Sequence, residues 1–305
     1  MKTAFLFAGQ GSQYAGMGKD LYEAGAVSKE LYHNETLPFD LTEVCFTDAQ
    51  NLLADTTYAQ PALLTTSLAI ASVLKAWIKP DYVCGLSLGE YSALAFAGVL
   101  SYQDAQMLVF RRGKLMAEAL PANTTGMMAV LQLDASTIAE ICVQVTGVCE
   151  IANYNCPGQI VISGELEALA QAKELCLARG ARRVLPLAVS GAFHSSLLTT
   201  ASKQLQAVLG DYQLHTPEVP VVFNVSGQIE TTGIKELLEK QICSPVLFEQ
   251  SIRYLLDQGV TRFIEIGPGT ALSGFVKKIA PDAIIYKADT MESMQKLKEA
   301  VYGNI

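Results

Sequence analysis

The sequence has no excess of basic residues. Its 305 residues include 22 Lys and Arg against 30 Asp and Glu, which gives a formal net charge of -8. Proteins that bind nucleic acid normally carry a basic excess, so we exclude a general nucleic-acid binder. Short basic clusters occur at 111–114, 179–183 and 277–278. We interpret most of them as solvated surface.

Long apolar runs are also missing, and no run approaches the roughly 20 residues needed to cross a bilayer. The apolar segment at 4–8 is too short for a secretory signal peptide, and Gly9-Gln10-Gly11 interrupts it. We therefore predict a first strand at 3–7 and expect a cytoplasmic protein without membrane contact. Because half of the residues are hydrophobic and only 17% are charged, we expect a large buried core.

Metal-binding cysteine motifs are absent as well. The seven cysteines include no CxxC pair and none with a nearby His, so we expect free buried thiols and no metal site. Cys142, Cys149 and Cys156 recur at intervals of seven. Gly147 and Pro157 interrupt any helix that could align these three thiols.

The glycine-containing loop at 9–11 fits no nucleotide-binding motif. A dinucleotide fingerprint would need a third Gly at position 14, which is Tyr14, and the Gly-Lys-Ser/Thr ending of a phosphate loop is missing. Two glycines around Gln10 instead allow the backbone to approach a ligand closely. They also leave amide N–H groups able to donate to it.

What the sequence does contain is a serine between two glycines, in Gly85-Leu86-Ser87-Leu88-Gly89. A short apolar run at 82–84 precedes it, and an alanine-rich helical run at 90–97 follows. A strand that turns abruptly into a helix in this way is typical of a nucleophile elbow, in which the tight turn exposes the serine hydroxyl. Five residues alone are as compatible with an ordinary strand-to-helix turn as with a catalytic serine.

A nucleophilic serine needs a base, and the chain has only three histidines. His33 lies in a polar region without clear periodicity, and His215 precedes Thr216-Pro217 in an expected surface connection. His194 lies in a loop of small residues that begins at Ser190. This position favours His194 as the general base.

The middle of the chain predicts a separate small unit. From Asn123 onward the elements follow the order β-α-β-β-α-β, at 127–133, 135–145, 149–154, 159–163, 165–179 and 182–187. This order is typical of a ferredoxin-like fold, and a cleft between such a unit and the main sheet is a natural ligand site. We predict a ferredoxin-like domain at 123–190, inserted into a larger domain formed by 1–122 and 191–305.

The remaining periodicity predicts an α/β fold for the larger domain. Pro61 suits the first turn of a helix that reaches Ile78. Further predicted helices cover 102–120, 245–258 and the segment from Gly269 to Lys278, and further predicted strands cover 219–225 and 262–266.

Seven motifs together resemble the malonyl-CoA:acyl carrier protein transacylases, and they span nearly the whole chain in the order of that family. They are Gly9-Gln10-Gly11-Ser12-Gln13, Gln60-Pro61-Ala62-Leu63, the elbow with Glu90, Arg112-Gly113, the NCPGQIVISG tract from Asn155 to Gly164, Phe193-His194-Ser195 and Gly267-Pro268-Gly269. Two positions differ from the family pattern, since Leu86 replaces a common His and Ala8 a common Pro. Neither position supplies a catalytic group.

The resemblance implies an α/β-hydrolase-like core with a central, mostly parallel sheet and an inserted ferredoxin-like domain. By the matching positions, Ser87 is the nucleophile and His194 the base. The backbone N–H groups of Gln10 and Leu88 form the oxyanion hole, and Arg112 binds the malonyl carboxylate.

Three further roles follow from the same resemblance. Gln60 and Asn155 are assigned to substrate binding, and the backbone carbonyl of Leu247 is expected to orient the imidazole of His194. Arg111 serves as an internal control for Arg112, because a helix points two successive side chains in different directions.

The implied activity is transfer of malonyl from malonyl-CoA to the phosphopantetheine thiol of acyl carrier protein, for fatty acid synthesis and without a cofactor. A free-standing acyltransferase of a polyketide synthase and a serine thioesterase or esterase are the alternatives. We expect a monomer. We also expect one or more of Arg182, Arg183, Lys277 and Lys278 to contact the acidic carrier protein.

Overall fold

The computed structural model describes residues 1–27, 29–189 and 191–303. Ser190, at which the predicted small unit ends and the loop before His194 begins, lies outside the described residues. Within them no helix is long and apolar enough to span a membrane.

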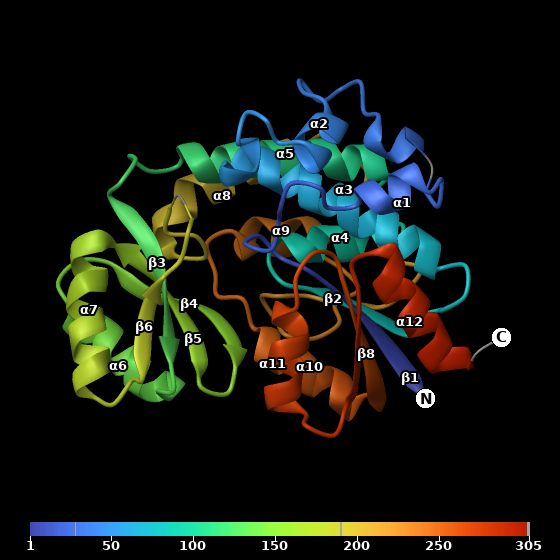
Figure 1. The fold of residues 1–305 in the computed structure, drawn as a ribbon. Coiled ribbons are helices and arrows are strands. Elements are labelled where there is room, and N and C mark those ends of the chain that lie inside the picture. The colour runs from blue at the N-terminus through green and yellow to red at the C-terminus, as the bar shows by residue number, and fades with distance from the viewer. Residues whose placement is uncertain (28, 190, 304–305) are drawn as a thin grey trace.

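The larger sheet has five parallel strands in the order β7-β2-β1-β8-β9 (Figure 1). Its strands are β1 (Lys2–Phe7), β2 (Tyr82–Gly85), β7 (Val221–Val222), β8 (Val260–Ile266) and β9 (Ile284–Ala288). The last residue of β1, Phe7, pairs with Gly85 on one side and with Ile266 on the other. The carboxyl ends of three strands therefore meet at one edge, where the serine elbow follows β2.

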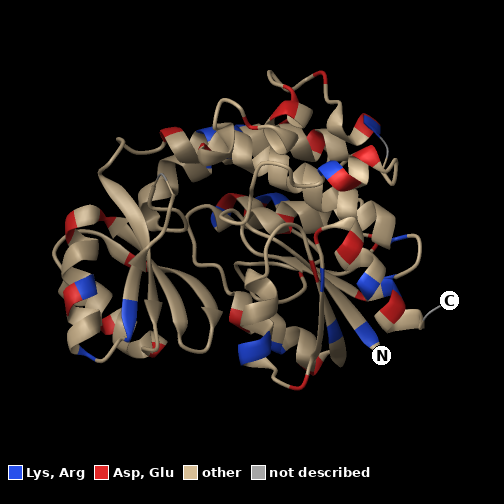
Figure 2. Ribbon diagram, viewed as in Figure 1, with Lys and Arg blue, Asp and Glu red and all other residues tan. Residues whose placement is uncertain are grey.

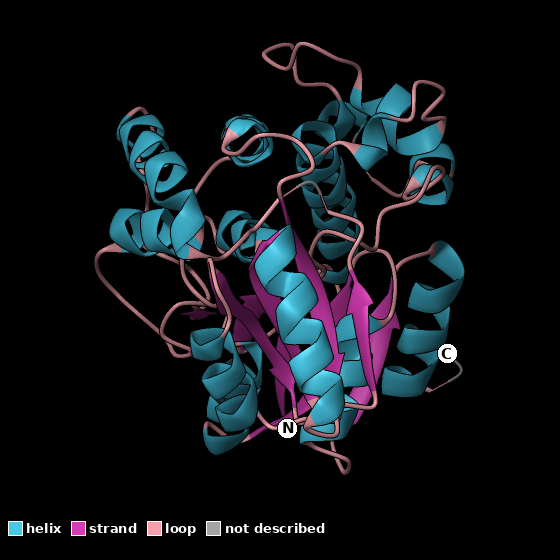
Figure 3. Cartoon of the chain, turned by 90° about the vertical axis from the view of Figure 1, so that its left-hand side faces the viewer, coloured by secondary structure: helices cyan, strands magenta, loops and turns pink. Residues whose placement is uncertain are grey.

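Helices cover both faces of this sheet, as Figures 1 and 3 show. Phe5 and Phe7 of β1 pack in one core and Ala4 and Leu6 in the other, because successive side chains of a strand point to opposite faces. The first core includes α1 (Lys19–Glu23), α2 (Leu41–Phe46), α3 (Thr56–Leu74), α4 (Leu88–Phe96), α5 (Tyr102–Glu118), α8 (Thr199–Gly210), α9 (Ile234–Gln241) and α12 (Met291–Tyr302). The second core includes α10 (Phe248–Asp257) and α11 (Ala271–Ile279).

The smaller sheet is antiparallel, in the order β4-β5-β3-β6. It consists of β3 (Thr125–Leu131), β4 (Cys149–Cys156), β5 (Gln159–Glu165) and β6 (Arg183–Pro186), with α6 (Ala135–Gln144) and α7 (Leu166–Ala178) on one face. On the other face Ala129 and Val161 pack in the first core of the larger sheet. Val246 joins the two parts, since its N–H and C=O bond to Ala152 and Tyr154 of β4.

Three of the predicted elements need correction. The helix predicted to begin near Pro61 begins at Thr56 and ends at Leu74, because Asp55 accepts a hydrogen bond from Thr57 N and caps it earlier. Pro61 therefore lies inside α3, where it has no N–H to donate to the carbonyl four residues earlier.

The other two differences lie in the carboxyl-terminal third. The strand predicted at 219–225 is only Val221–Val222, because the chain folds back into a turn in which Phe223 N–H bonds to Gln228 O. The helix predicted from 245 begins at Phe248, since both backbone groups of Val246 already pair with β4.

Candidate active site

A cavity of about 270 Å³ opens between the two sheets. Its walls come from the 8–12 loop, the elbow and α11 on one side, and from β3, β4 and β5 on the other. Gln10, Ser87, Asn155 and His194 all line it, so the structure brings together four of the residues expected from the sequence.

The elbow is built as the glycines predict. Ser87 has φ 53° and ψ −103°, a backbone conformation that L-residues rarely adopt. A Cβ added at Gly85 would lie 1.9 Å from the carbonyl carbon of Gly89, and one at Gly89 would lie 2.1 Å from Phe7 O. Only glycine fits at these two positions, and this close packing allows the sharp turn that points Ser87 into the cavity.

Ser87 and His194 form a hydrogen-bonded pair. Ser87 Oγ and His194 Nε2 are 2.7 Å apart, and His194 Nδ1 lies 2.8 Å from the backbone carbonyl of Gln241. A carbonyl can only accept, so Nδ1 carries the proton and Nε2 has the lone pair that faces the serine hydroxyl. This arrangement is the one in which an imidazole can accept the serine proton.

The carbonyl that orients His194 corrects the expectation for Leu247. The Leu247 carbonyl accepts from Ser251 N and from Ser251 Oγ, each at 2.9 Å, because Leu247 caps the start of α10. Gln241 is instead the last residue of α9, where helix carbonyls lack an intrahelical partner. The acceptor for His194 is therefore the carbonyl at the end of α9, and not the Leu247 carbonyl at the start of α10.

His194 is held in its neutral form. It is buried, with 3% of its surface exposed. Burial lowers its pKa to about 4, and the nearby Arg112 guanidinium adds to the shift, whereas hydrogen bonds to the backbone of Gln241 and Ser244 oppose it. At neutral pH the imidazole is therefore ready to accept a proton.

Arg112 is fully buried beside this pair. Its guanidinium donates to Gln60 Oε1 at 2.8 Å, to Gln241 Oε1 at 2.9 Å and to Ser87 Oγ at 3.3 Å. The Tyr91 ring lies against it, with 5.0 Å between the guanidinium carbon and the ring centroid. The groups that the guanidinium contacts directly are thus neutral, whereas the Glu90 carboxyl acts on its positive charge only at longer range.

No carboxylate forms an ion pair with Arg112 in the part of the chain that the structure describes, and its Nε has no hydrogen-bond partner there. Arg111 behaves differently, since it is partly exposed and pairs with Asp211 at 2.8 Å. A buried charge without a counterion is costly, and an anionic ligand would relieve that cost. The site therefore favours a ligand with a carboxylate near the reactive serine.

Sequence reasoning missed two amides that hold the elbow. Asn224 Oδ1 accepts from Ser87 N at 2.7 Å and Asn224 Nδ2 donates to Gly85 O at 2.6 Å. Gln241 Nε2 donates to Ser87 O at 2.9 Å. Neither amide stands in a motif, so no local signal could have identified it. Glu90, next to the elbow, accepts from Asn224 N and fixes the loop that carries this asparagine.

The remaining expected residues occupy different positions around Ser87. Gln60 is buried and holds Arg112 through its carbonyl oxygen, so its side chain reaches a ligand only through that arginine. Asn155 lines the cavity, and its buried Oδ1 has no partner among the described residues. Leu88 is the first residue of α4, where amide N–H groups lack an intrahelical acceptor.

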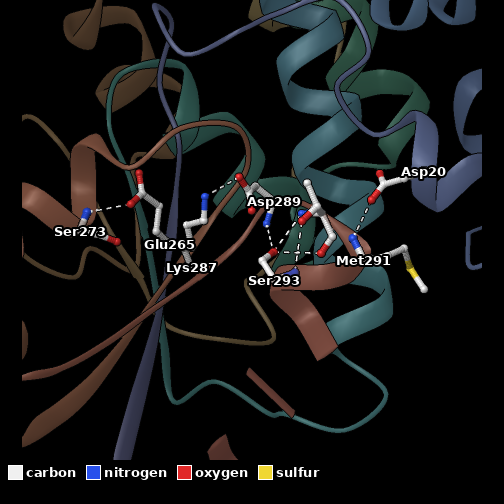
Figure 4. Close-up of polar contacts among 8 residues, drawn as sticks. Asp20, Glu265, Ser273, Lys287, Asp289, Met291 and Ser293 are labelled. Atoms are coloured by element: carbon white, nitrogen blue, oxygen red, sulfur yellow. Dashed lines mark hydrogen bonds and ion pairs between the residues drawn. The ribbon is translucent and has the colours of Figure 1, made fainter. Parts of the chain in front are cut away.

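Glu265 holds the start of α11, which forms part of the cavity wall. This carboxylate accepts from Leu272 N at 3.0 Å and from Ser273 N at 2.8 Å, which caps the first turn of the helix. Figure 4 shows Glu265 beside Ser273, with Lys287 turned toward Asp289. Burial raises the pKa of Glu265. The residues of α11 that line the cavity are thereby held in place.

Leu86, where we noted a departure from the family pattern, also lines the cavity. A Cβ added at Gly9 would lie 2.6 Å from Leu86 O and 2.8 Å from its side chain. The leucine therefore packs directly over the loop that contains Gln10.

Three comparisons with known proteins match nearly the whole chain, and each matches acyltransferases. A family model described as "Acyl transferase domain" matches residues 4–297. A protein of Bacillus subtilis (strain 168) named malonyl CoA-acyl carrier protein transacylase is 46% identical, with 98% of each chain covered. A crystal structure of the protein so named from Clostridium perfringens has a TM-score of 0.95 at 42% identity, covering 99% of this chain and 97% of that one.

A further similar structure was solved with a partner. It is described as a type II polyketide synthase acyl carrier protein in complex with its malonyl-transacylase. It is 37% identical to this chain, with a TM-score of 0.95, and the match covers 98% of this chain and 100% of that one.

Proposed function

Because this chain belongs to the acyl transferase family, we propose that it transfers the malonyl group of malonyl-CoA to the thiol of acyl carrier protein. The observation that carries the proposal is the buried Arg112 guanidinium, 3.3 Å from the hydroxyl of a serine that is paired with a histidine. Ser87 and His194 can carry out acyl transfer. Arg112, which has no ion-pair partner among the described residues, selects an acyl group that carries a carboxylate.

In the first step Ser87 Oγ attacks the thioester carbonyl while His194 Nε2 takes its proton. The backbone N–H groups of Gln10 and Leu88 are proposed to stabilise the resulting oxyanion, an interaction worth roughly 3–4 kcal/mol per donor in related sites. The tetrahedral intermediate then collapses, and His194 returns the proton to the departing thiolate of CoA. The product is a malonyl-serine ester.

In the second step the phosphopantetheine thiol of the carrier attacks this ester. His194 takes the thiol proton, and the same two amides stabilise the second oxyanion. The ester bond breaks, Ser87 recovers its proton from His194, and malonyl leaves as a thioester of the carrier. Both steps need only a neutral imidazole, so no metal or redox cofactor enters the mechanism.

The malonyl carboxylate is assigned to Arg112, where a guanidinium can donate two parallel hydrogen bonds. Gln60 and Gln241 already hold the guanidinium in place. Asn155, whose side-chain oxygen has no partner among the described residues, is the further polar group that we assign to the substrate. A thioesterase or esterase would give Arg112 no role, and this argues for malonyl transfer.

The fold is proposed to combine an α/β-hydrolase-like domain at 1–122 and 191–305 with a ferredoxin-like domain at 123–190. The parallel sheet with a serine elbow after β2 supports the first assignment. The chain order β3-α6-β4-β5-α7-β6 in one antiparallel sheet supports the second. We place the protein in cytoplasmic fatty acid synthesis and expect it to act as a monomer.

The carrier protein is proposed to dock across the mouth of the cavity. Figure 2 shows basic residues on β6 and around α11, on the two sides of the gap between the sheets. Arg183 begins β6, and Lys277 and Lys278 lie in the last turn of α11. The related complex between a malonyl-transacylase and its carrier supports a docking of this kind.

The test is the intact mass of the protein after mixing with malonyl-CoA. We expect one malonyl group on the wild-type protein and none on Ser87→Ala, and we expect added holo carrier protein to remove it as malonyl-carrier. Free malonate in place of malonyl-carrier would indicate a hydrolase. A malonyl group retained by Ser87→Ala would refute the assignment of the nucleophile.

A further inference from the structure

Two cysteines, one in α6 and one in the smaller sheet, have their sulfur atoms in contact. Cys142 lies in the last turn of α6 and Cys149 begins β4, and their Sγ atoms are 3.6 Å apart. A spacing of seven would place both on one face of a continuous helix, but Gly147, with φ 92°, interrupts any such helix. The same glycine lets the chain turn back, so the residue that prevents helical alignment brings the two thiols together.

The two thiols differ in their surroundings. Cys149 is 5% exposed and packs in the core beneath α6 and α7, whereas Cys142 is partly exposed. The Cys149 S–H can donate to Cys142, and this hydrogen bond lowers the pKa of Cys142 and raises that of Cys149. The accessible sulfur is thus the one that the contact favours as a thiolate, and a thiolate is the nucleophile in thiol chemistry.

Other cysteines lack this combination. Cys45 and Cys84 are fully buried, and burial raises the pKa of each to about 12. Cys176 packs in the same core as Cys149, and burial raises its pKa to about 11. Among the described residues, Cys142 and Cys149 are the only two cysteines with a hydrogen bond between their sulfur atoms. Cys142 with Cys149 is therefore the pair that is arranged to react.

We propose that Cys142 and Cys149 form a redox-active pair that closes to an intramolecular disulfide when a peroxide is the oxidant. The Cys142 thiolate attacks one peroxide oxygen and the O–O bond breaks. With hydrogen peroxide this gives the sulfenic acid and a hydroxide, which becomes water by taking up the proton that the Cys142 thiol had released to solvent. The Cys149 sulfur then attacks the sulfenic sulfur, its proton and the sulfenic hydroxyl leave as a second water, and the S–S bond forms. Two thiols are oxidised and one peroxide is reduced.

The disulfide would tie the end of α6 to the start of β4. Asn153 and Asn155, which line the cavity, lie four and more residues further along the same strand. A strand rises about 3.3 Å per residue, so on the order of 13 Å of strand separates Cys149 from Asn153, the nearer of the two. The pair is thus a modification site separate from the acyl-transfer chemistry.

The chain offers a precise test. Cleavage after Glu140 and Glu150 releases the peptide ICVQVTGVCE, from Ile141 to Glu150, which contains both cysteines and no other. The reduced full-length protein is treated with hydrogen peroxide, its remaining thiols are alkylated, and this peptide is weighed. We expect it to lose two hydrogens without alkylation, and a thiol reductant added before alkylation to restore both sites.

Two controls decide whether folding causes the reaction. The disulfide should form on the order of tenfold faster in the folded chain than in the same chain in urea, because the fold holds the sulfurs together. Cys176→Ser should leave the reaction unchanged, whereas Cys142→Ser should abolish it. Oxidation that is no faster than in urea, oxygen added to a single cysteine, or a peptide that stays fully reduced would overturn the proposal.

Discussion

Ser87 and His194 are both held in backbone conformations with positive φ, at 53° and 59°. Such conformations cost of order 1–3 kcal/mol each and persist where the surroundings impose them. Asn224 and Gln241 bond to the backbone of Ser87, and the backbone N–H of His194 donates to the Ile242 carbonyl, so tertiary contacts hold both conformations. The geometry of the pair is therefore fixed before substrate arrives.

The lowered pKa of His194 predicts how the reaction depends on pH. Because this pKa is about 4 instead of 6.5, kcat/KM for malonyl-CoA should stay level as pH falls through 6.5 and decline only near pH 4. A stopped-flow measurement of Ser87 acylation against pH checks this. In Arg112→Ala the decline should move to higher pH, since the repelling guanidinium is gone. A decline centred at 6.5 in the wild type would contradict the prediction.

The same shift affects stability. The folded-state pKa of His194 lies below its unfolded value, so below pH 6.5 the unfolded chain binds the proton more readily. The free energy of unfolding therefore includes the full contribution of neutral His194 above pH 6.5. This contribution decreases as the pH falls from 6.5 toward 4.

Arg112 carries the prediction for substrate choice. Arg112→Ala should lower kcat/KM for malonyl-CoA by on the order of 100-fold, because hydrogen bonds to a charged group contribute about 1.5–3 kcal/mol. The value for acetyl-CoA, which has no carboxylate, should change much less. Arg111→Ala is the matched control, since its exposed pair with Asp211 lies outside the cavity. Equal losses for both substrates would contradict the assigned role.

At the scale of elements, the elbow depends on how closely α4 packs against β1. A methyl group at Gly89 would clash with backbone atoms of Phe7, which cannot move without disturbing the larger sheet. We expect Gly89→Ala to lower the free energy of unfolding by about 3 kcal/mol or more. Urea unfolding measures this change.

Gly274 is the matched control for that substitution. It lies inside α11, and a Cβ there would meet nothing within 4 Å. Gly274→Ala should therefore stabilise the protein by about 0.5–1 kcal/mol, as alanine does in a helix interior. If both variants had the same effect, steric contact at the elbow would not explain the need for glycine at position 89.

At the scale of the whole molecule, the cavity exists only because two sheets face each other. Its reactive pair comes from the larger part, whereas Asn155 and Val161 come from the smaller sheet. Val246 links the two through backbone hydrogen bonds with β4. The basic residues proposed to bind the carrier lie on β6 and α11, on both sides of this gap. The docking surface therefore depends on how the two parts are arranged.

The docking proposal predicts a salt-dependent defect. Lys278→Glu should raise the concentration of carrier protein needed for half-maximal transfer from the malonylated enzyme, by several-fold at low salt and less at high salt. The measurement is single-turnover transfer from pre-formed malonyl-enzyme. Lys203→Glu, an exposed change on α8 away from the cavity lining, should have no such effect. Equal behaviour of the two variants would place the carrier elsewhere.

Local sequence determined much of this protein, because a turn or a helix boundary depends on a few neighbouring residues. The glycines around Ser87 predicted the elbow, and the predicted helix at 135–145 begins, as α6 does, at Ala135. Periodicity also predicted the α-β order of the smaller sheet. The family resemblance assigned the carboxylate to Arg112, and helix geometry predicted only that Arg111 would point elsewhere.

Only the tertiary structure decided which distant groups complete the site. Gln241 orients His194 in place of Leu247, and Asn224 holds the serine amide. Cys142 and Cys149 meet only because a turn reverses the chain between them. These contacts join backbone atoms or amides that any sequence position could supply, so nothing in their immediate neighbours marks them. Local sequence thus determined the helices, the strands and the motifs that contain the reactive residues. Packing between distant elements determined which groups bond to those residues.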